Sequence, residues 1–84
     1  VLGLDDAAVE GFTYFPNPSS DVLNLSATNN IDTVSIYNLL GQVVLSQKVN
    51  ATSSQLNISE FSTGSYIMKV TSNGVTGSYK VIKR

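Results

Sequence analysis

The sequence predicts an all-β fold, an immunoglobulin-like antiparallel β-sandwich of about seven strands. Short runs rich in Val, Ile, Thr and Tyr are separated by clusters of Pro, Gly, Asn and Ser at fairly regular spacing. No helical period of useful length appears. The chain has 84 residues, of which 42% are hydrophobic, so it suits one globular domain and is too short for a second core.

The first segment of the chain, residues 1–11, holds half of the six acidic residues and shows no clear period. It is expected to be a linker or a frayed segment that precedes a domain of residues 12–84. A weak edge strand from Val9 to Tyr14 is the open alternative. The seven expected strands are, in chain order, Phe12–Phe15, Asp21–Ser26, Thr33–Asn38, Gln42–Val49, Ser54–Ile58, Ser65–Ser72 and Thr76–Lys83.

Apolar residues recur at every second position in these runs, which is the spacing of one buried face of a sheet. They predict the core. Its members are Leu23, Leu25, Val34, Ile36, Val43, Leu45, Leu56, Ile58, Tyr66, Met68, Val70, Tyr79 and Val81.

The turns between the runs have recognisable chemistry. Asn73-Gly74 between two alternating runs is a strong hairpin signal. Gly41 ends a four-residue loop, Asn38–Gly41, at a position where positive φ is expected. Pro16 and Pro18 fix φ and remove two backbone donors, so the segment before the second run is expected to form a rigid bend.

Most enzyme chemistry is disfavoured by composition. The chain has no His and no Cys, so a nucleophile would lack its usual base, and disulfides and thiolate metal sites are excluded. Lys69 and Lys80 are expected on the solvent face. Asp5, Asp6 and Glu10 would give at best a weak calcium site. No enzyme activity and no cofactor are therefore expected.

Two classes of partner are also disfavoured. The net charge is −1 and no basic patch precedes the end of the chain, which argues against nucleic acid. No apolar run approaches the roughly 18 residues of a membrane helix. The first residues, Val1-Leu-Gly-Leu, lack the basic leader and the apolar stretch of a signal peptide, and the chain is expected to be the end of a longer protein.

Four motifs occur in order, and together they are more specific than any one alone. They are Phe15-Pro-Asn-Pro followed by Asp21-Val-Leu-Asn-Leu-Ser, then Val34-Ser-Ile-Tyr-Asn-Leu-Leu-Gly-Gln-Val-Val, then Leu56-Asn-Ile-Ser-Glu-Phe-Ser-Thr-Gly-Ser-Tyr, and a final Lys80-Val-Ile-Lys-Arg. Over about residues 14–84 the set resembles the type A C-terminal sorting domain of proteins exported by the type IX secretion system of Bacteroidota. Phe15 stands where that pattern usually has Tyr.

The resemblance implies a function and partners. Such a domain directs an attached N-terminal cargo across the outer membrane, and a sortase-like protease typically removes it, so the cargo is released or anchored at the cell surface. The implied partners are the type IX machinery, that protease and the cargo, with the domain itself monomeric. The cleavage point would lie in or before residues 1–11.

The expected recognition surface combines the rigid proline segment with the final hairpin, whose edge strand could pair with a partner. Its residues are Pro16, Asn17, Pro18, Gly41, Gly64, Tyr66, Lys80, Val81, Ile82, Lys83 and Arg84. Charge at Lys83 and Arg84 would favour an acidic receptor. Protection of the edge against aggregation is the other interpretation of those two cations.

Two other functions remain open from the sequence. A carbohydrate-binding module would need exposed coplanar aromatic residues, and the candidates are Tyr14, Phe15, Tyr37, Tyr66 and Tyr79. A spacer domain would need no binding surface, and further domains after Arg84 in the parent reading frame would favour it. The fold alone does not choose among these functions.

Overall fold

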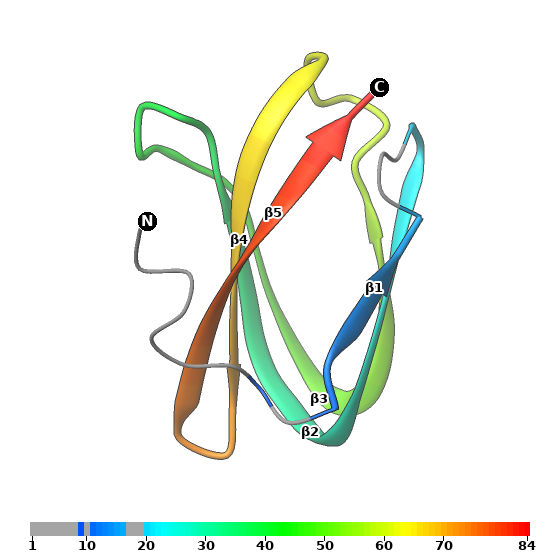
Figure 1. Ribbon diagram of the computed structural model, residues 1–84, viewed down its shortest axis with the longest axis vertical. Coiled ribbons are helices and arrows are strands. Elements are labelled where there is room, and N and C mark those ends of the chain that lie inside the picture. The colour runs from blue at the N-terminus through cyan, green and yellow to red at the C-terminus, as the bar shows by residue number, and fades with distance from the viewer. Residues whose placement is uncertain (1–8, 10, 17–19) are drawn as a thin grey trace.

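A computed structural model describes residues 9, 11–16 and 20–84 of this protein. The described residues form five strands, all paired antiparallel (Figure 1). They are β1 (Thr13–Phe15), β2 (Val22–Tyr37), β3 (Val43–Asn57), β4 (Gly64–Ser72) and β5 (Val75–Lys83). A search of the described residues finds no helical segment with the length and hydrophobicity of a membrane span.

The long strands β2 and β3 pair on both sides of a bend that they share, so each contributes to both layers of a sandwich (Figure 1). One layer holds β1, the first part of β2 and the last part of β3. The other holds the first part of β3, the last part of β2, then β4 and β5. Register shifts between Ser26 and Thr33 of β2 mark the bend, as expected where bulges turn a strand.

The prediction of seven strands was therefore wrong in number, because the structure has five. Two pairs of expected strands are continuous. All but the outermost residues of Asp21–Ser26 and Thr33–Asn38 lie in β2, and all but the outermost residues of Gln42–Val49 and Ser54–Ile58 lie in β3. The polar residues between the expected strands looked like loops, yet each strand stays extended through the bend. Of the residues in between, only Ile31 of β2 and Ala51 and Ser53 of β3 have ladder partners, and bulges absorb the change of direction.

The core follows the alternation that the sequence shows. Ten of the predicted residues are buried: Leu23, Leu25, Val34, Ile36, Leu56, Ile58, Tyr66, Met68, Val70 and Val81. Leu45 and Tyr79 are partly buried against them. Val43 was predicted wrongly, since it is 55% exposed. An irregularity opposite Tyr37 pairs that residue with Val43 and leaves Val44 as the extra residue, which reverses the side to which Val43 points.

Both hairpin turns form as predicted. Asn73 and Gly74 have φ of 54° and 79°, the left-handed pair that a two-residue hairpin turn requires, and Ser72 pairs with Val75 across it. Gly41 has φ of 86° in the loop between β2 and β3. The Phe15–Pro16 peptide bond is cis.

An aromatic cluster joins β1 to β5 across the two layers. The ring of Phe12 lies 4.6 Å from that of Tyr79 and 5.8 Å from that of Tyr14, and Tyr14 meets Tyr79 edge to face at 5.7 Å. The N–H of Val9 donates to Tyr79 Oη at 2.9 Å, and Val9 is buried in the core. The described part of the expected linker thus packs against the domain.

Gly77 has no side chain, and the ring of Tyr79 occupies the space where a Cβ would lie. A Cβ at Gly77 would lie 2.7 Å from Tyr79 Oη and 3.0 and 3.1 Å from two ring carbons. We expect Gly77→Ala to displace the ring and lower the free energy of unfolding by about 1 to 3 kcal/mol. Urea unfolding measures this, with Ser78→Ala on the outward side of the same strand as control. Equal stability of the two variants would contradict this role for Gly77.

Candidate recognition site

The strand registers bring the sequence motifs to one end of the sandwich. Val22 pairs with Asn57, Tyr37 pairs with both Val43 and Ile67, and Gly64 pairs with Lys83. We call this the loop-rich end, at the top of Figure 1, and define it by residues 15–16, 20–21, 38–42, 58–64 and 83–84. The opposite end consists of the β2 and β3 bends and the turn between β4 and β5.

The loop between β2 and β3 is organised by Asn38. Its side-chain Oδ1 accepts from the N–H groups of Leu40 and Gln42, both at 3.0 Å, and its Nδ2 donates to Gln42 Oε1 at 2.9 Å. The side chain thus takes the place of backbone partners, as Asn does in turns. The loop fixed by these bonds exposes Leu39 and Leu40 to solvent, and the two residues are 74% and 84% exposed.

The loop between β3 and β4 is fixed at both ends. Asn57 Oδ1 accepts from the N–H of Ser59 at 3.0 Å and from its hydroxyl at 2.7 Å. Tyr66 Oη donates to the carbonyl of Ser62 at 2.7 Å, while its ring packs on Phe61 at 5.1 Å. A buried Tyr that bonds back to the preceding loop is similar to the tyrosine corner of immunoglobulin-like sandwiches.

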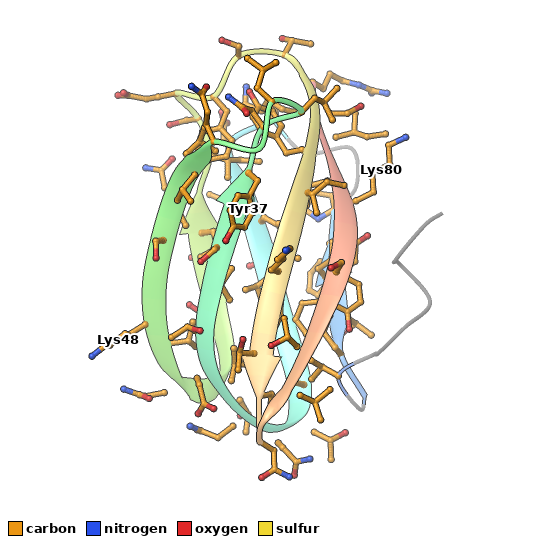
Figure 2. All side chains as sticks on the ribbon, turned by 90° about the vertical axis from the view of Figure 1, so that its left-hand side faces the viewer. Tyr37, Lys48 and Lys80 are labelled. Atoms are coloured by element: carbon orange, nitrogen blue, oxygen red, sulfur yellow. The ribbon has the colours of Figure 1, made fainter. Side chains whose placement is uncertain are left out.

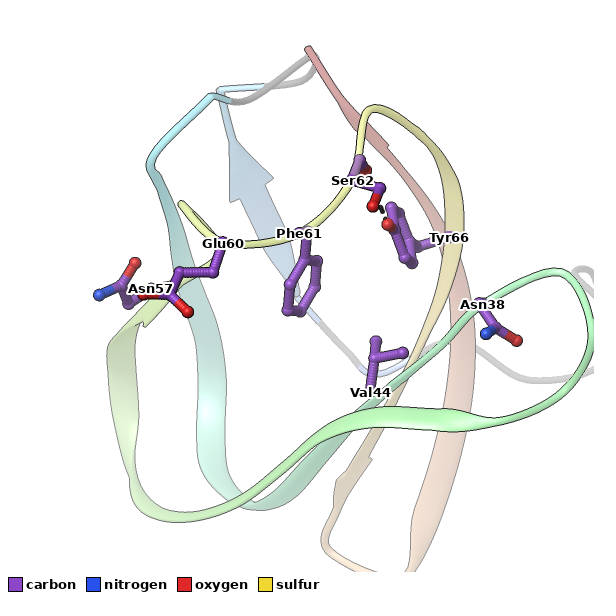
Figure 3. Close-up of a pocket in the computed structure, with 7 residues that line it drawn as sticks. All are labelled: Asn38, Val44, Asn57, Glu60, Phe61, Ser62 and Tyr66. Carbon is purple, nitrogen blue, oxygen red and sulfur yellow. Dashed lines mark hydrogen bonds between the residues drawn. The ribbon is translucent and has the colours of Figure 1, made fainter.

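A pocket of about 750 Å³ opens between these two loops and the two layers (Figure 3). Its lining is Asn38, Val44, Asn57, Glu60, Phe61, Ser62 and Tyr66. Val44, Phe61 and Tyr66 supply an apolar wall, and two amides with Glu60 supply polar groups. Its size lies in the range of ordinary binding pockets. With one acidic group and no base in its lining, it suits binding of an apolar group better than catalysis.

The last strand alternates between the two sides of its layer. Val81 and Lys83 are buried, with Lys83 8% exposed, whereas Lys80 and Arg84 are exposed and Ile82 is half-buried. Lys83 Nζ donates to the carbonyl of Arg84 at 3.4 Å. An inward-pointing Lys on an edge strand is one way in which sheets avoid unwanted pairing.

The edge of β5 is covered in part by Tyr14. The hydroxyl of Tyr14 donates to the carbonyl of Lys80 at 2.7 Å. Burial raises the pKa of Tyr14, and the nearby Tyr79 raises that pKa further. Lys80 and Ile82 have further interactions. The final strand, expected to be an edge that a partner can extend, is therefore engaged within the domain.

The predicted site residues fall into three groups. Pro16, Gly41, Gly64 and Arg84 lie at the loop-rich end with Lys83, and Lys80 and Ile82 lie one to three residues before it. Tyr66 and Val81 are buried beneath that surface. Asn17 and Pro18 lie outside the described residues. The pocket residues Asn38, Val44, Asn57 and Phe61 were not predicted, although an Asn before a Leu-Leu-Gly loop signals a side-chain-stabilised turn.

Metal and sugar sites gain little support from this geometry. The described residues contain no group of three or more possible metal ligands, and Asp5, Asp6 and Glu10 lie outside them. Of the candidate sugar-binding aromatics, Tyr66 is buried, and Tyr14 and Tyr79 pack in the cluster with Phe12. Phe15 and Tyr37 lie in different layers, and Lys69 Nζ stands 5.3 Å over the Tyr37 ring.

Comparison with known proteins identifies a family and a curated relative. A model of the secretion-system C-terminal sorting domain matches residues 13–84. An ulvan lyase of Nonlabens ulvanivorans is 36% identical over 74 residues, and the match covers 86% of this chain but 14% of the lyase. This chain therefore spans only a small part of that curated relative.

A solved structure supports the fold. It is a DUF3244-family protein of Bacteroides vulgatus with an immunoglobulin-like β-sandwich, and it matches with a TM-score of 0.66 over 84% of each chain. Sequence identity is 19%, so this likeness shows the fold alone. It confirms the predicted sandwich class.

The burial of Tyr14, whose hydroxyl bonds to the carbonyl of Lys80, makes stability depend on pH. The pKa of Tyr14 is raised on folding. Its contribution to the free energy of unfolding is therefore complete below the ordinary tyrosine pKa of about 10 and is lost as the pH rises through the pKa of the folded state. We expect Tyr14→Phe to cost about 1 kcal/mol near neutral pH. The difference in free energy of unfolding between wild type and variant should shrink above about pH 10.

Urea unfolding of both proteins across this pH range measures the gap, and Tyr37→Phe controls for the loss of a hydroxyl outside the contact. A gap that stays constant at alkaline pH would show that Tyr14 does not contribute in this way.

Proposed function

This chain belongs to the family of secretion-system C-terminal sorting domains, and from that premise we propose that the type IX machinery recognises the loop-rich end of its folded sandwich. As a member of that family it serves as a sorting signal for secretion across the outer membrane and is not itself the enzyme of the protein that carries it.

The observation that carries the proposal is the convergence of distant motifs. Pro16, Gly41, Gly64 and Arg84 are far apart in sequence, but the strand registers bring them to one end. A sorting receptor must distinguish this domain from other β-sandwiches. A surface assembled from four separate motifs offers that distinction, because it exists only when the domain is folded.

Exposed and buried residues have different roles in this proposal. Arg84 and the Leu39-Leu40 pair are exposed and are able to contact a partner. Tyr66 and Val81 are buried, so they act by positioning the loops and the last strand. Gly64, with φ of 153°, starts β4 directly opposite Lys83 and leaves open space where a side chain would stand.

The cargo and its fate follow by analogy with the relative. Because the matching protein is an ulvan lyase in which the region similar to this chain is a small part, we propose that the cargo here is likewise a secreted enzyme that precedes the domain. A sortase-like protease would then remove the domain, in or before residues 1–11, and leave the cargo free or at the cell surface.

A reporter experiment tests the function. A fluorescent protein with an export signal and residues 1–84 at its C-terminus is expressed in a Bacteroidota host with and without a working type IX translocon. We expect reporter in the medium or on the surface only in the host with the translocon. Reporter held in the periplasm of both hosts would contradict the proposal.

The role of the terminal charge can be separated from general effects of charge. We expect Arg84→Ala to lower the export rate of the reporter about threefold to tenfold, as loss of a charge at an interface slows encounter. Arg84→Lys keeps the positive charge at this position and should export normally. Normal export of Arg84→Ala together with increased aggregation would instead assign Arg84 to edge protection.

A further inference from the structure

We propose that the open edge of β3, from Val43 to Lys48, binds an extended peptide segment of the export machinery by strand addition. The segment would place an apolar side chain inward, against the pocket beside Val44, and an acidic side chain outward, beside Lys48. This inference rests on the proposed function, and it assigns that function a specific contact.

The edge of β3 lacks the cover that β5 has. In the described part of the chain β3 pairs with β2 alone, so one side of its backbone faces away from the sheet along the whole strand. At the other margin of the layer, Tyr14 bonds to the β5 backbone. Strand addition needs such an open row of backbone donors and acceptors.

The residues along this edge are unusually apolar for an open strand. Val43 and Val44 are 55% and 40% exposed, and Leu39 and Leu40 lie exposed in the adjoining loop. Open edges are normally guarded by charges, proline or bulges. Strand β3 contains no proline and one charged residue, Lys48, and between Val43 and Lys48 it has one inserted residue, Val44. Beyond Lys48, Asn50 has φ of 51° and the register shifts again, which ends this segment of the edge.

The irregularity at Val44 connects the edge to the pocket. Ile36 pairs with Leu45 and Tyr37 with Val43, so Val44 is the inserted residue. Bulges often re-aim a side chain next to a functional site. Val44 points into the pocket, toward Phe61 and Tyr66 (Figure 3). An inward side chain on an added strand would be its cross-strand neighbour, so an apolar group there would cover the pocket.

The outer face of the same layer has a single sign of charge. Lys48, Lys69 and Lys80 occupy outward positions on β3, β4 and β5, and Figure 2 shows this face with Tyr37 toward its loop-rich end. The three described carboxylates, Asp21, Asp32 and Glu60, lie toward the two ends of the sandwich. Charge complementarity therefore favours an acidic residue on the outward side of the added strand.

A second copy of this chain fits the edge less well. If two copies paired through β3, their inward residues such as Leu45 would remain packed in their own cores, and neither could cover the partner's pocket. A separate peptide has free side chains on both sides. The pocket thus favours an extended segment of another protein as the occupant.

Two neighbouring substitutions test the contact in the reporter assay. Val44→Lys places a cation on the inward side, where strand addition would bury it, and we expect export to fall about tenfold or more. Val43→Lys makes the same change one residue away on the outward side, where we expect less than about a threefold effect. Circular dichroism and thermal unfolding verify that both variants fold.

A photocrosslinking residue at Ser46 gives a readout that does not depend on these variants. During export it should crosslink to an extended segment of a translocon component, mapped by mass spectrometry, while the same residue at Thr76 on β5 should not. Equal export of Val44→Lys and Val43→Lys, or equal crosslinking from both positions, would overturn the inference while leaving translocon-dependent export of the wild type intact.

Two further results would also overturn it. A wild-type chain that sediments as a dimer, and that Val44→Lys converts to a monomer, would assign the edge to a second copy. Export of the wild-type reporter that does not require the translocon would overturn the proposed function and this contact with it.

Discussion

The paired bend of β2 and β3 is the constraint on which the rest of the molecule depends. Both strands are long, and they stay in register with each other on either side of the shifts between Ser26 and Thr33. Because they fold back as a unit, the start and the end of β2 reach the same end of the sandwich. The loop of Asn38, the loop of Phe61 and the last residues of β5 are neighbours for this reason.

The two edge strands of the larger layer, β5 and β3, differ in how far their edges are covered. At β5 the aromatic cluster, the Tyr14 hydroxyl and the inward Lys83 occupy the edge and its surroundings. At β3 the apolar side chains of Val43 and Val44 are left exposed beside a pocket. An open apolar edge is an aggregation hazard. Its presence in a domain that otherwise covers its edge is understandable if a partner uses it.

Alternation and turn chemistry were enough to predict the sandwich, ten of its core residues and both hairpin turns. They failed where long-range pairing decides the outcome. The continuity of β2 and β3 through polar residues could not be seen, because the bulges that keep both strands extended through the bend leave no local signal in the sequence. Val43 was wrongly predicted in the core for the same reason, because the side to which it points depends on an inserted residue opposite Tyr37.

The candidate site was predictable only as a set of motifs. Their order indicated the family, but the motifs did not show that they meet at one end, nor that Tyr66 and Val81 are buried there. The covering of β5 by Tyr14 joins residues 66 positions apart, and no local pattern shows such a contact. The expectation that β5 is the edge available to a partner followed from sequence order, which does not show that β3 also has an open edge.

Amide hydrogen exchange of a cargo fusion, free and bound to the purified translocon, tests the central claim that a folded sandwich is recognised at its loop-rich end. The account predicts slower exchange on binding in residues 38–48 and 58–66, with no change in the turn at residues 72–75. Protection centred on that turn, or faster exchange throughout the domain, would contradict it, since the first places recognition at the opposite end and the second means that the domain unfolds when it is recognised.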